Sequence, residues 1–311
     1  RRDTPAEYDA WDIDRADADA PPVLLAADSA PTITIESSAM AQVKTTYGHG
    51  ASSFTLLWTL RAGSTRLEAR LDADWHGSEE RLQWVMPVNV LAREALCGIQ
   101  FGHVRRARHQ NTSWDAARFE VCAHRYVYIS EPGCGVGVLA DGPRGYDVRN
   151  QTLALTLLRA PRFPDPACDL GPQTIEWSLY LNSGAQDIAL LENEAARVAH
   201  PLRFVEHSVP SSTIPVVVDA DGVMVSTIKL AEDGSGDLIV RLWECRGARS
   251  SGTMRMAGQV LNVERCNALE EIDHHPNSEI TWKDGGEGHA QVDLNFAPFE
   301  IRSYRIKFAP R

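Results

Sequence analysis

The sequence predicts an all-β fold built as two sandwich units. Short segments in which apolar and polar residues alternate recur along the chain, with Gly, Pro and Asp between them. That spacing is typical of sandwich strands and not of βαβ units. A single stretch has the period of a helix, and a proline-bounded stretch, Pro210 to Pro215, separates two groups of strands.

The first group of strands follows an acidic segment. Residues 1 to 31 are rich in Ala, Asp and Pro, and we expect an irregular surface segment anchored by Tyr8 and Trp11. Alternation and short apolar runs then predict the following strands: Thr32 to Glu36, Phe54 to Leu60, Leu67 to Trp75, Leu82 to Val88, Phe119 to Ser130, Gly135 to Ala140, Thr152 to Leu158 and Ile175 to Leu181.

The predicted helix runs from Asp187 to Ala199, where apolar residues recur at helical spacing, and Pro201 ends it. Beyond Pro215 we expect a smaller sandwich. Its predicted strands are Val223 to Leu230, Leu238 to Trp243, Met254 to Val263, Ala290 to Phe296 and Ile301 to Phe308, with a hairpin turn at Glu232 to Asp237.

Composition excludes several partner classes. The 311 residues carry a net charge of −11, so the chain has no basic surplus to replace the counterions of a nucleic acid or an anionic membrane. No apolar run approaches the length of a membrane span. Six scattered cysteines form no C-x-x-C pair, which indicates free buried thiols, a reducing cytoplasmic location and no zinc site.

Known motifs of catalysis are missing. The glycines of Gly133 to Gly137 run into a strand instead of a helix, so they serve close backbone packing and not phosphate binding. No G-x-S-x-G nucleophile motif occurs. His274 and His275 suit a surface loop, and no spacing marks two carboxylates as acid and nucleophile.

The segment from Gly102 to Glu131 is the densest in chemistry, since charged, amide and aromatic residues crowd into a loop before a strand. From Phe119 to Ser130 one face is apolar and the opposite face is polar and aromatic. That second face suits either the docking of another domain or buried packing between sheets.

Ordered motifs along the chain resemble the C-terminal region of class II α-mannosidases, glycoside hydrolase family 38. The motifs that carry this resemblance are Tyr8-Asp-Ala-Trp-Asp-Ile-Asp14, Asn111-Thr-Ser-Trp-Asp115, Arg118-Phe-Glu-Val121, Ala123-His-Arg125, Gly145-Tyr-Asp-Val148, Leu157-Leu-Arg-Ala-Pro161, Arg241-Leu-Trp-Glu244 and Pro298-Phe-Glu-Ile301. The sequence departs from the family pattern at Cys134, Gln173 and Asn182.

The resemblance implies a fold and a division of labour. Residues 1–208 would form a galactose-mutarotase-like supersandwich that would lack its first strands, and residues 209–311 a terminal β-sandwich. The family's zinc ligands and aspartate nucleophile lie in an N-terminal catalytic domain whose pattern this chain does not contain. The chain alone is therefore expected to be inactive and to bind no zinc. Its partners would be that catalytic domain and a mannose-containing carbohydrate, and a homo-oligomer stays open.

Four residues are candidates for contact with substrate. Arg159 ends a predicted strand before Pro161, so it could project beyond the sandwich and hold sugar hydroxyls; the competing interpretation is a salt bridge to Asp165 or Asp169. Asp115, His109 and Trp114 are weaker candidates of the same kind. No catalytic and no metal-binding residue is expected in the chain.

Two other functions remain open. One is a carbohydrate-binding or interaction module, although the eight Trp residues are more simply explained as core fillers. The other is an aldose epimerase, which would need His124 and Glu120 to converge on a sugar from one face of a strand. This second alternative depends on fold analogy.

Overall fold

The chain divides into two compact units. The computed structural model describes residues 1–202, 216–275, 280–286 and 289–309. One unit holds Arg1–Ile99, Val104–Gln186 and Glu194–Pro201, and the other holds Gln100–His103, Asp187–Asn193 and Leu202–Arg311. The predicted boundary between residues 208 and 209 lies outside the described residues, so the limits 1–208 and 209–311 stay a prediction.

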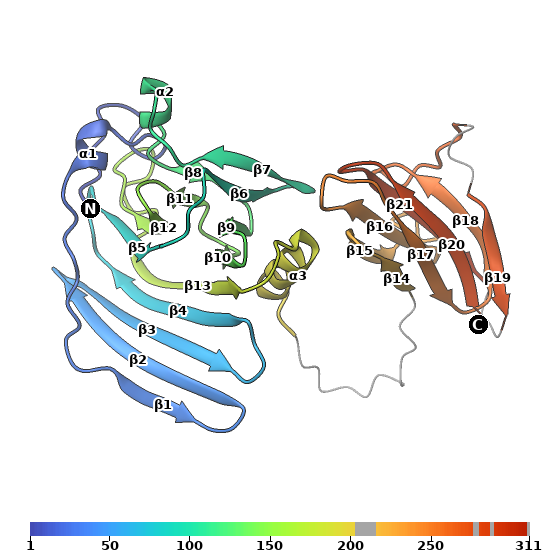
Figure 1. The fold of residues 1–311 in the computed structure, drawn as a ribbon, viewed down its shortest axis with the longest axis horizontal. Coiled ribbons are helices and arrows are strands. Elements are labelled where there is room, and N and C mark those ends of the chain that lie inside the picture. Colours follow the sequence, from blue (N-terminus) through green and yellow to red (C-terminus); the bar gives the residue numbers. More distant parts are fainter. Residues whose placement is uncertain (203–215, 276–279, 287–288, 310–311) are drawn as a thin grey trace. The chain divides into compact units, whose positions relative to one another are not determined.

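A large antiparallel sheet forms most of the first unit (Figure 1). Within the described residues it has nine strands in the order β1-β2-β3-β4-β13-β10-β9-β6-β7. Their bounds are β1 Thr32–Glu36, β2 Met40–His49, β3 Ser52–Arg61, β4 Arg66–Trp75, β6 Glu94–Ile99, β7 Gly102–Ala107, β9 Tyr126–Glu131, β10 Cys134–Ala140 and β13 Gly171–Asn182.

A smaller sheet lies on the concave side of the large one (Figure 1). Its order among the described strands is β5-β12-β11-β8, with β5 at Arg81–Pro87, β12 at Thr152–Arg159, β11 at Gly145–Asp147 and β8 at Val121–Cys122. Two short helices, α1 (Arg15–Asp19) and α2 (Ser113–Ala116), lie outside the sheets. Apolar side chains of both sheets form one core, to which Leu153, Leu155, Val127 and Trp177 belong.

Some tryptophan side chains fill this core, as predicted, but others lie outside it. Trp75 and Trp177 are buried, and the rings of Trp177 and Trp58 meet edge to face with centroids 5.9 Å apart. Trp11 and Trp114 are exposed, so the prediction that tryptophans fill the core is wrong at these two positions.

The predicted strand Phe119 to Ser130 is wrong as a single element. β8 and β9 belong to different sheets, and the chain turns between them at Arg125, whose φ is +66°. A left-handed residue cannot continue a strand. Tyr126 and Tyr128 are buried, so the aromatic part of the polar-aromatic face packs inside the unit, whereas Cys122 of the same face is exposed.

The second unit is a β-sandwich of two antiparallel sheets. Among the described strands their orders are β14-β17-β20-β19 and β15-β16-β21-β18. The bounds are β14 Val216–Ala220, β15 Val223–Leu230, β16 Leu238–Glu244, β17 Ser250–Ala257, β18 Val260–Cys266, β19 Trp282–Gly286, β20 His289–Phe296 and β21 Ile301–Phe308. Its core includes Val240, Leu242, Met254, Val292 and Ile306.

Of two further predictions for the second unit, one is wrong and one is confirmed. The predicted strand Met254 to Val263 is wrong, because the chain changes sheets at Gly258, with φ +113°, between β17 and β18. The hairpin at Glu232 to Asp237 is confirmed, since it joins the paired strands β15 and β16.

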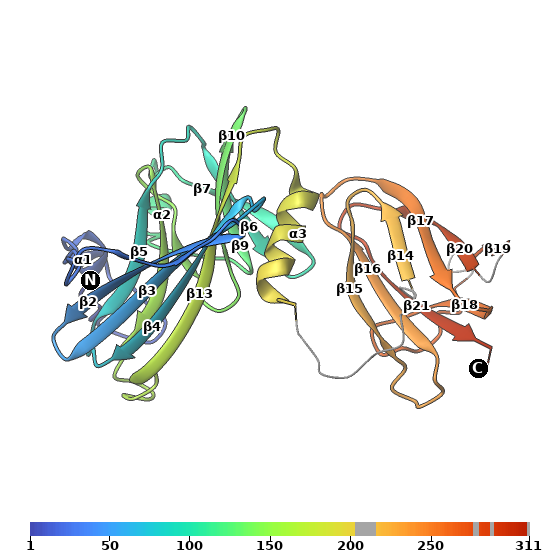
Figure 2. The same cartoon turned by 90° about the horizontal axis from the view of Figure 1, so that it is seen from below.

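The predicted helix is confirmed as α3, Ile188–Ala199, which Figure 2 shows as one continuous helix. Among the described residues no helix combines the length and apolar character needed to span a bilayer. The all-β fold class is thus confirmed in both units.

Candidate functional site

Helix α2 is stabilised by its first polar residues. The hydroxyl of Thr112 accepts a hydrogen bond from the backbone N–H of Asp115 at 3.1 Å and donates to Asp115 Oδ2 at 2.7 Å. This is a helix N-cap, the arrangement that satisfies otherwise unpaired N–H groups. The hydrogen bond from Thr112 holds the pKa of Asp115 below its usual range, so this carboxylate stays ionised in neutral solution.

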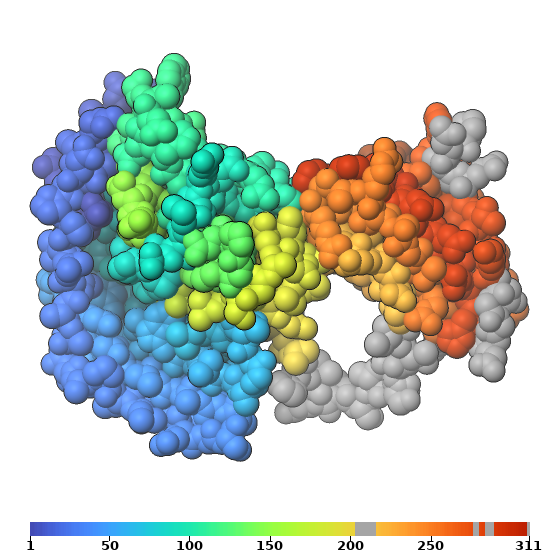
Figure 3. All heavy atoms as spheres, in the orientation of Figure 1, coloured from blue at the N-terminus to red at the C-terminus, as the bar shows by residue number. Residues whose placement is uncertain are grey.

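Asp115 also lies beside an imidazole and a guanidinium group at the surface. His109 Nδ1 lies 3.4 Å from its Oδ2 and Arg118 Nη2 lies 3.1 Å from its Oδ1. The neighbouring Trp114 is 83% exposed. Three of the four predicted contact residues, Asp115, His109 and Trp114, therefore lie at one corner of the first unit, which we call the α2 corner. Figures 1 and 3 show α2 at the surface of this unit.

A polar hollow of about 640 Å³ adjoins this corner at His109. Its wall includes Gln110, whose amide donates to Asn150 Oδ1 at 2.8 Å. Beneath it the buried Arg108 donates to the carbonyl oxygens of Val148 and Val90 at 2.8 and 3.3 Å, which fixes the two loops in place. An exposed aromatic ring beside amide and imidazole groups is suited to contact with a sugar.

The fourth predicted residue, Arg159, lies elsewhere and is tied to the N-terminal segment. Its Nε donates to Asp3 Oδ2 at 2.6 Å, and the side chain of Asp3 is only 2% exposed. Its two terminal nitrogens donate to the carbonyl oxygens of Asp9, Ala10 and Asp12 at 2.8 to 3.2 Å. Every nitrogen of the guanidinium is thus engaged by the chain itself.

The predicted salt bridge from Arg159 to Asp165 or Asp169 is wrong. The carboxylate of Asp169 instead accepts the backbone N–H of Arg159 at 3.1 Å. The contact of Arg159 with substrate stays a prediction, although Asp3 and three backbone carbonyl groups already occupy its donors.

The predicted anchors of the N-terminal segment are also wrong. Tyr8 and Trp11 are 63% and 64% exposed. The segment is held by carboxylates, since the buried Asp17 accepts the N–H of Thr4 at 2.6 Å and Asp3 pairs with Arg159. Ionic anchors of this kind leave no apolar pattern by which the sequence could identify them.

Glu120 is a structural carboxylate whose side chain is 15% exposed. Its Oε1 accepts hydrogen bonds from Arg81 at 3.2 Å, from Gln83 at 3.0 Å and from the hydroxyl of Thr156 at 2.6 Å. Burial raises its pKa even though Arg81 opposes the shift. The premise of the epimerase alternative is wrong, because Glu120 precedes β8 and His124 lies after it, at the turn toward β9.

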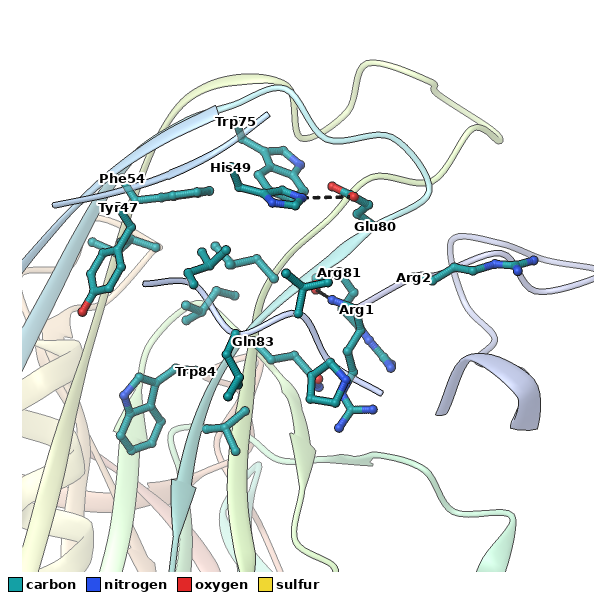
Figure 4. A pocket seen from close by; sticks show the side chains of 18 of the residues that line it. Arg1, Arg2, Tyr47, His49, Phe54, Trp75, Glu80, Arg81, Gln83 and Trp84 are labelled. Atoms are coloured by element: carbon teal, nitrogen blue, oxygen red, sulfur yellow. Dashed lines mark hydrogen bonds and ion pairs between the residues drawn. The ribbon is translucent and has the colours of Figure 1, made fainter. Parts of the chain in front are cut away.

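A second hollow, larger than the one beside His109, lies beside strand β5. It has a volume of about 730 Å³ and lies between the N-terminal segment, the face of the large sheet and the edge of the small one. Figure 4 shows the aromatic rings of Tyr47, Phe54, Trp75 and Trp84 around it. Polar groups at its rim include His49, whose Nε2 lies 3.2 Å from Glu80 Oε1.

Sequence reasoning missed this hollow, since its walls come from segments far apart in the chain. One signal was present. Pro87 ends the strand Arg81–Pro87, and proline is confined to edge strands and strand ends because it cannot donate to a neighbour.

The described residues do not fit the zinc site that the resemblance implies for the whole enzyme. No three His, Cys, Asp or Glu side chains in the described part of the chain lie close enough to hold a metal ion. Tetrahedral zinc sites need three or four such ligands.

Comparison with known proteins identifies the family. The model of the glycosyl hydrolases family 38 C-terminal domain matches residues 2–167, and that of the family 38 C-terminal beta sandwich domain matches residues 222–304. The chain belongs to glycosyl hydrolase family 38. It corresponds to the C-terminal β region of that family, as the motifs from Tyr8 to Ile301 predicted.

Curated relatives are much longer than this chain. "Alpha-mannosidase 2C1" of Homo sapiens is 32% identical over 261 residues, which are 81% of this chain and 24% of that protein. "Alpha-mannosidase G" of Dictyostelium discoideum is 30% identical over 270 residues, 83% of this chain and 24% of that protein. The chain spans about a quarter of the length of these relatives.

A solved structure supports the fold. The alpha-mannosidase from Enterococcus faecalis V583 superposes with a TM-score of 0.73 at 16% identity, over 92% of this chain and 35% of that one. At this identity the likeness concerns the fold alone. With the family assignment, it confirms the predicted supersandwich followed by a terminal β-sandwich.

Proposed function

We propose that this chain is the non-catalytic C-terminal β portion of a zinc-dependent, retaining α-mannosidase that acts on α-mannosides. Zinc and the aspartate nucleophile are held by a catalytic part outside these residues, and the β portion supports that part. The observation that carries the proposal is the match of both family models to a chain that spans about a quarter of the length of the named alpha-mannosidases.

The structure suits a supporting role. Two packed sheets with a shared aromatic core form a rigid body, and the charged groups inside it serve its own packing. The Asp3–Arg159 pair and the bonds of Glu120 are examples, since each engages residues of the first unit. Rigid elements of this kind position a neighbouring site more precisely than loops do.

The α2 corner is the part of the first unit that we assign to contact with the mannoside or with the catalytic part. Trp114 offers an exposed ring, and His109 with Asp115 offers polar groups beside it. A ring stacked on a sugar and adjacent hydrogen-bonding groups are a common arrangement in carbohydrate recognition.

Activity and zinc content test the division of labour. The purified chain and the longer protein encoded by the gene are assayed with an aryl α-mannoside, and zinc is measured by elemental analysis. We expect turnover and bound zinc in the longer protein, and neither in the chain of residues 1–311. Turnover by the chain alone, or one tightly bound zinc per chain, would contradict the proposal.

The alternative of a carbohydrate-binding module is favoured by one observation, the polar hollow beside His109 and the exposed Trp114. Titration of the isolated chain with mannose and mannobiose, followed by the tryptophan signals in NMR, separates the two. Saturable shifts of the Trp114 resonance in the chain alone favour the module. Shifts seen only in the longer enzyme favour the supporting role.

The proposal also places the enzyme in the cytoplasm. Six cysteines are free, and Cys97, Cys245 and Cys266 among them are buried. Thiols in this state are typical of a reducing compartment.

A further inference from the structure

Strand β5 forms one edge of the smaller sheet of the first unit. It pairs with β12 on one side only, in the order β5-β12-β11-β8. Backbone groups of alternate residues point to opposite sides of a strand. The N–H and C=O of Glu80 point toward β12, because the Glu80 oxygen accepts a hydrogen bond from the N–H of Ala160 at 3.0 Å. The N–H and C=O of Arg81 point to the opposite side of β5, the free side, where no strand pairs with it among the described residues.

The first residues of the chain occupy one end of this free edge. The backbone N–H of Arg81 donates to the Arg1 oxygen at 2.7 Å, and the backbone nitrogen of Arg1 donates to the Arg81 oxygen at 2.9 Å. Arg2 and Glu80 form an antiparallel bridge, and Asp3 donates to the Glu79 oxygen at 2.8 Å. Arg1–Asp3 is thus the beginning of an antiparallel neighbour of β5.

Beyond Arg81 the edge is open. By the same alternation the backbone groups of Gln83 and Val85 point to the free side, and no described backbone group bonds to them there. Pro87 is the next residue whose backbone faces the free side, and proline has no N–H that needs a partner. Proteins generally cover or charge such an edge, because unpaired strands invite pairing.

An unfilled apolar hollow accompanies the open edge. The cavity of about 730 Å³ is bordered by Leu82, Trp84 and Val85 of β5 and by Val23 and Leu24 of the N-terminal segment. Figure 4 shows Trp84 and Gln83 beside it. Val85 is 48% exposed and Leu24 is 84% exposed. Apolar groups left in water beside an unpaired edge favour a strand with apolar side chains over a polar ligand.

We propose that a β-strand of the same polypeptide pairs antiparallel with β5 from Leu82 to Pro87 and fills this cavity with its apolar side chains. The inference rests on the proposed function, in which the enzyme has a part outside these residues. The antiparallel bridge at Arg2 sets the direction, so the residues that precede Arg1 would lie opposite Leu82, Gln83 and onward. About six residues before Arg1 would reach the position opposite Pro87.

The length of the relatives supplies the occupant. Because 261 and 270 aligned residues are each 24% of those proteins, the relatives are roughly 3.5 times as long as this chain, so polypeptide is available to form the strand. Its side chains would alternate: apolar residues facing the cavity beside Trp84, and polar residues facing the side of Gln83 and Glu120. The strand would then complete the smaller sheet and join the β portion covalently to the catalytic part.

Hydrogen exchange of individual amides tests the pairing. Exchange is compared between residues 1–311 and the longer protein encoded by the gene. We expect the amides of Gln83 and Val85 to exchange at least about 100-fold more slowly in the longer protein, because pairing protects them from water. The amides of Leu82 and Trp84, which face β12, are the control and should be protected in both.

Equal exchange of Gln83 and Val85 in the two proteins overturns the proposal. Protection that appears in the chain of residues 1–311 and rises with its concentration also overturns it, since a second copy would then be the partner. The mannosidase activity of the longer protein is assayed in parallel. If the longer protein is active and the amides of Gln83 and Val85 are unprotected, only the proposed strand pairing is refuted. If these amides are protected and the longer protein is inactive, only the proposed function is refuted.

A substitution gives an independent measurement. Val85→Pro removes an N–H that points only to the free side, so it should lower the melting temperature of the longer protein more than that of the chain. An equal loss in both proteins overturns the pairing. If the variant chain does not fold, the exchange measurement on the unsubstituted proteins still decides.

Discussion

Arg159 shows how much structure a single side chain can organise. It binds Asp3 and three carbonyl oxygens of the N-terminal segment, so it joins the end of β12 to residues about 150 positions away in the sequence. Asp3 is nearly inaccessible to water, and a buried carboxylate is costly unless it is paired. The pair therefore determines where the N-terminal segment lies on the first unit.

Replacing Arg159 should destabilise the first unit. In Arg159→Ala, Asp3 loses its partner, and we expect the free energy of unfolding to fall by about 3 kcal/mol, the scale of a broken buried ion pair. Urea unfolding of the purified chain measures it. Arg162→Ala is the matched control, because Arg162 is exposed and its bond to Glu79 at 3.0 Å should contribute less than about 1 kcal/mol.

Kinetics of the proposed longer enzyme then separate the two roles of Arg159. If the residue contacts substrate, kcat/KM falls at temperatures where the variant remains folded. We expect unchanged kinetics under those conditions, since the donors of Arg159 are already engaged.

Trp114 should behave in the opposite way. In the longer enzyme, Trp114→Ala should lower kcat/KM by about tenfold, or about 1.4 kcal/mol of transition-state binding, with little change in stability, since the ring is exposed. Trp11→Ala is the control, because Trp11 is another exposed ring of the same unit. Equal kinetics for both variants would remove Trp114 from the substrate-binding candidates.

At the scale of elements, the sequence predicted strands well where alternation is regular. The strands near Leu67 to Trp75 and Thr152 to Leu158 were found within one residue of their ends. β2, Met40–His49, was missed because its polar and Thr-rich residues leave its partly buried faces without a clear period. The breaks at Arg125 and Gly258 were missed because a single left-handed residue does not interrupt the apolar pattern on either side.

The glycines of β10 were predicted to serve close packing, and the structure confirms it. A Cβ on Gly135 would lie 1.7 Å from the hydroxyl oxygen of Tyr128 and one on Gly137 would lie 3.2 Å from the Tyr128 ring. Tyr128 is buried, so it has little room to move aside.

Substituting Gly135 should therefore disturb the large sheet. We expect Gly135→Ala to lower the free energy of unfolding by about 1–3 kcal/mol, the usual cost of overpacking. Gly142→Ala is the control, since a Cβ there meets no atom within 4 Å. Thermal unfolding followed by near-UV circular dichroism measures both, and equal melting temperatures would contradict the packing argument.

At the scale of the whole molecule, the sequence motifs were sufficient to identify the family, but they predicted only part of the candidate site. His109, Trp114 and Asp115 are close in sequence, so their grouping could be anticipated. Asp3 could not be identified as the partner of Arg159, because the chain has 42 acidic residues and nothing local distinguishes one from another. The cavity beside β5 depends on how sheets face each other, which no local pattern encodes.

The six thiols provide a test of the whole fold. Burial raises the pKa of Cys97 to about 11 and that of Cys245 to about 12, so both should resist iodoacetamide at pH 8. The exposed Cys122 should react first. Cys168 is exposed but should react more slowly, because partial desolvation of its thiol and the nearby Asp169 carboxylate raise its pKa.

Mass spectrometry of labelled peptides gives the order, and labelling in urea is the control in which all six cysteines should react. Modification of Cys97 or Cys245 in the native protein as fast as that of Cys122 would contradict the packing of both units.

The distance along the chain between Asp3 and Arg159 has a consequence for synthesis. The two residues are 156 positions apart, and a ribosome adds about 5–20 residues per second. Asp3 therefore emerges on the order of ten seconds or more before its partner exists. Until then its carboxylate has to stay in water, so the segment that carries Asp3 docks only after Arg159 has been made and is exposed to chaperones and proteases throughout that interval.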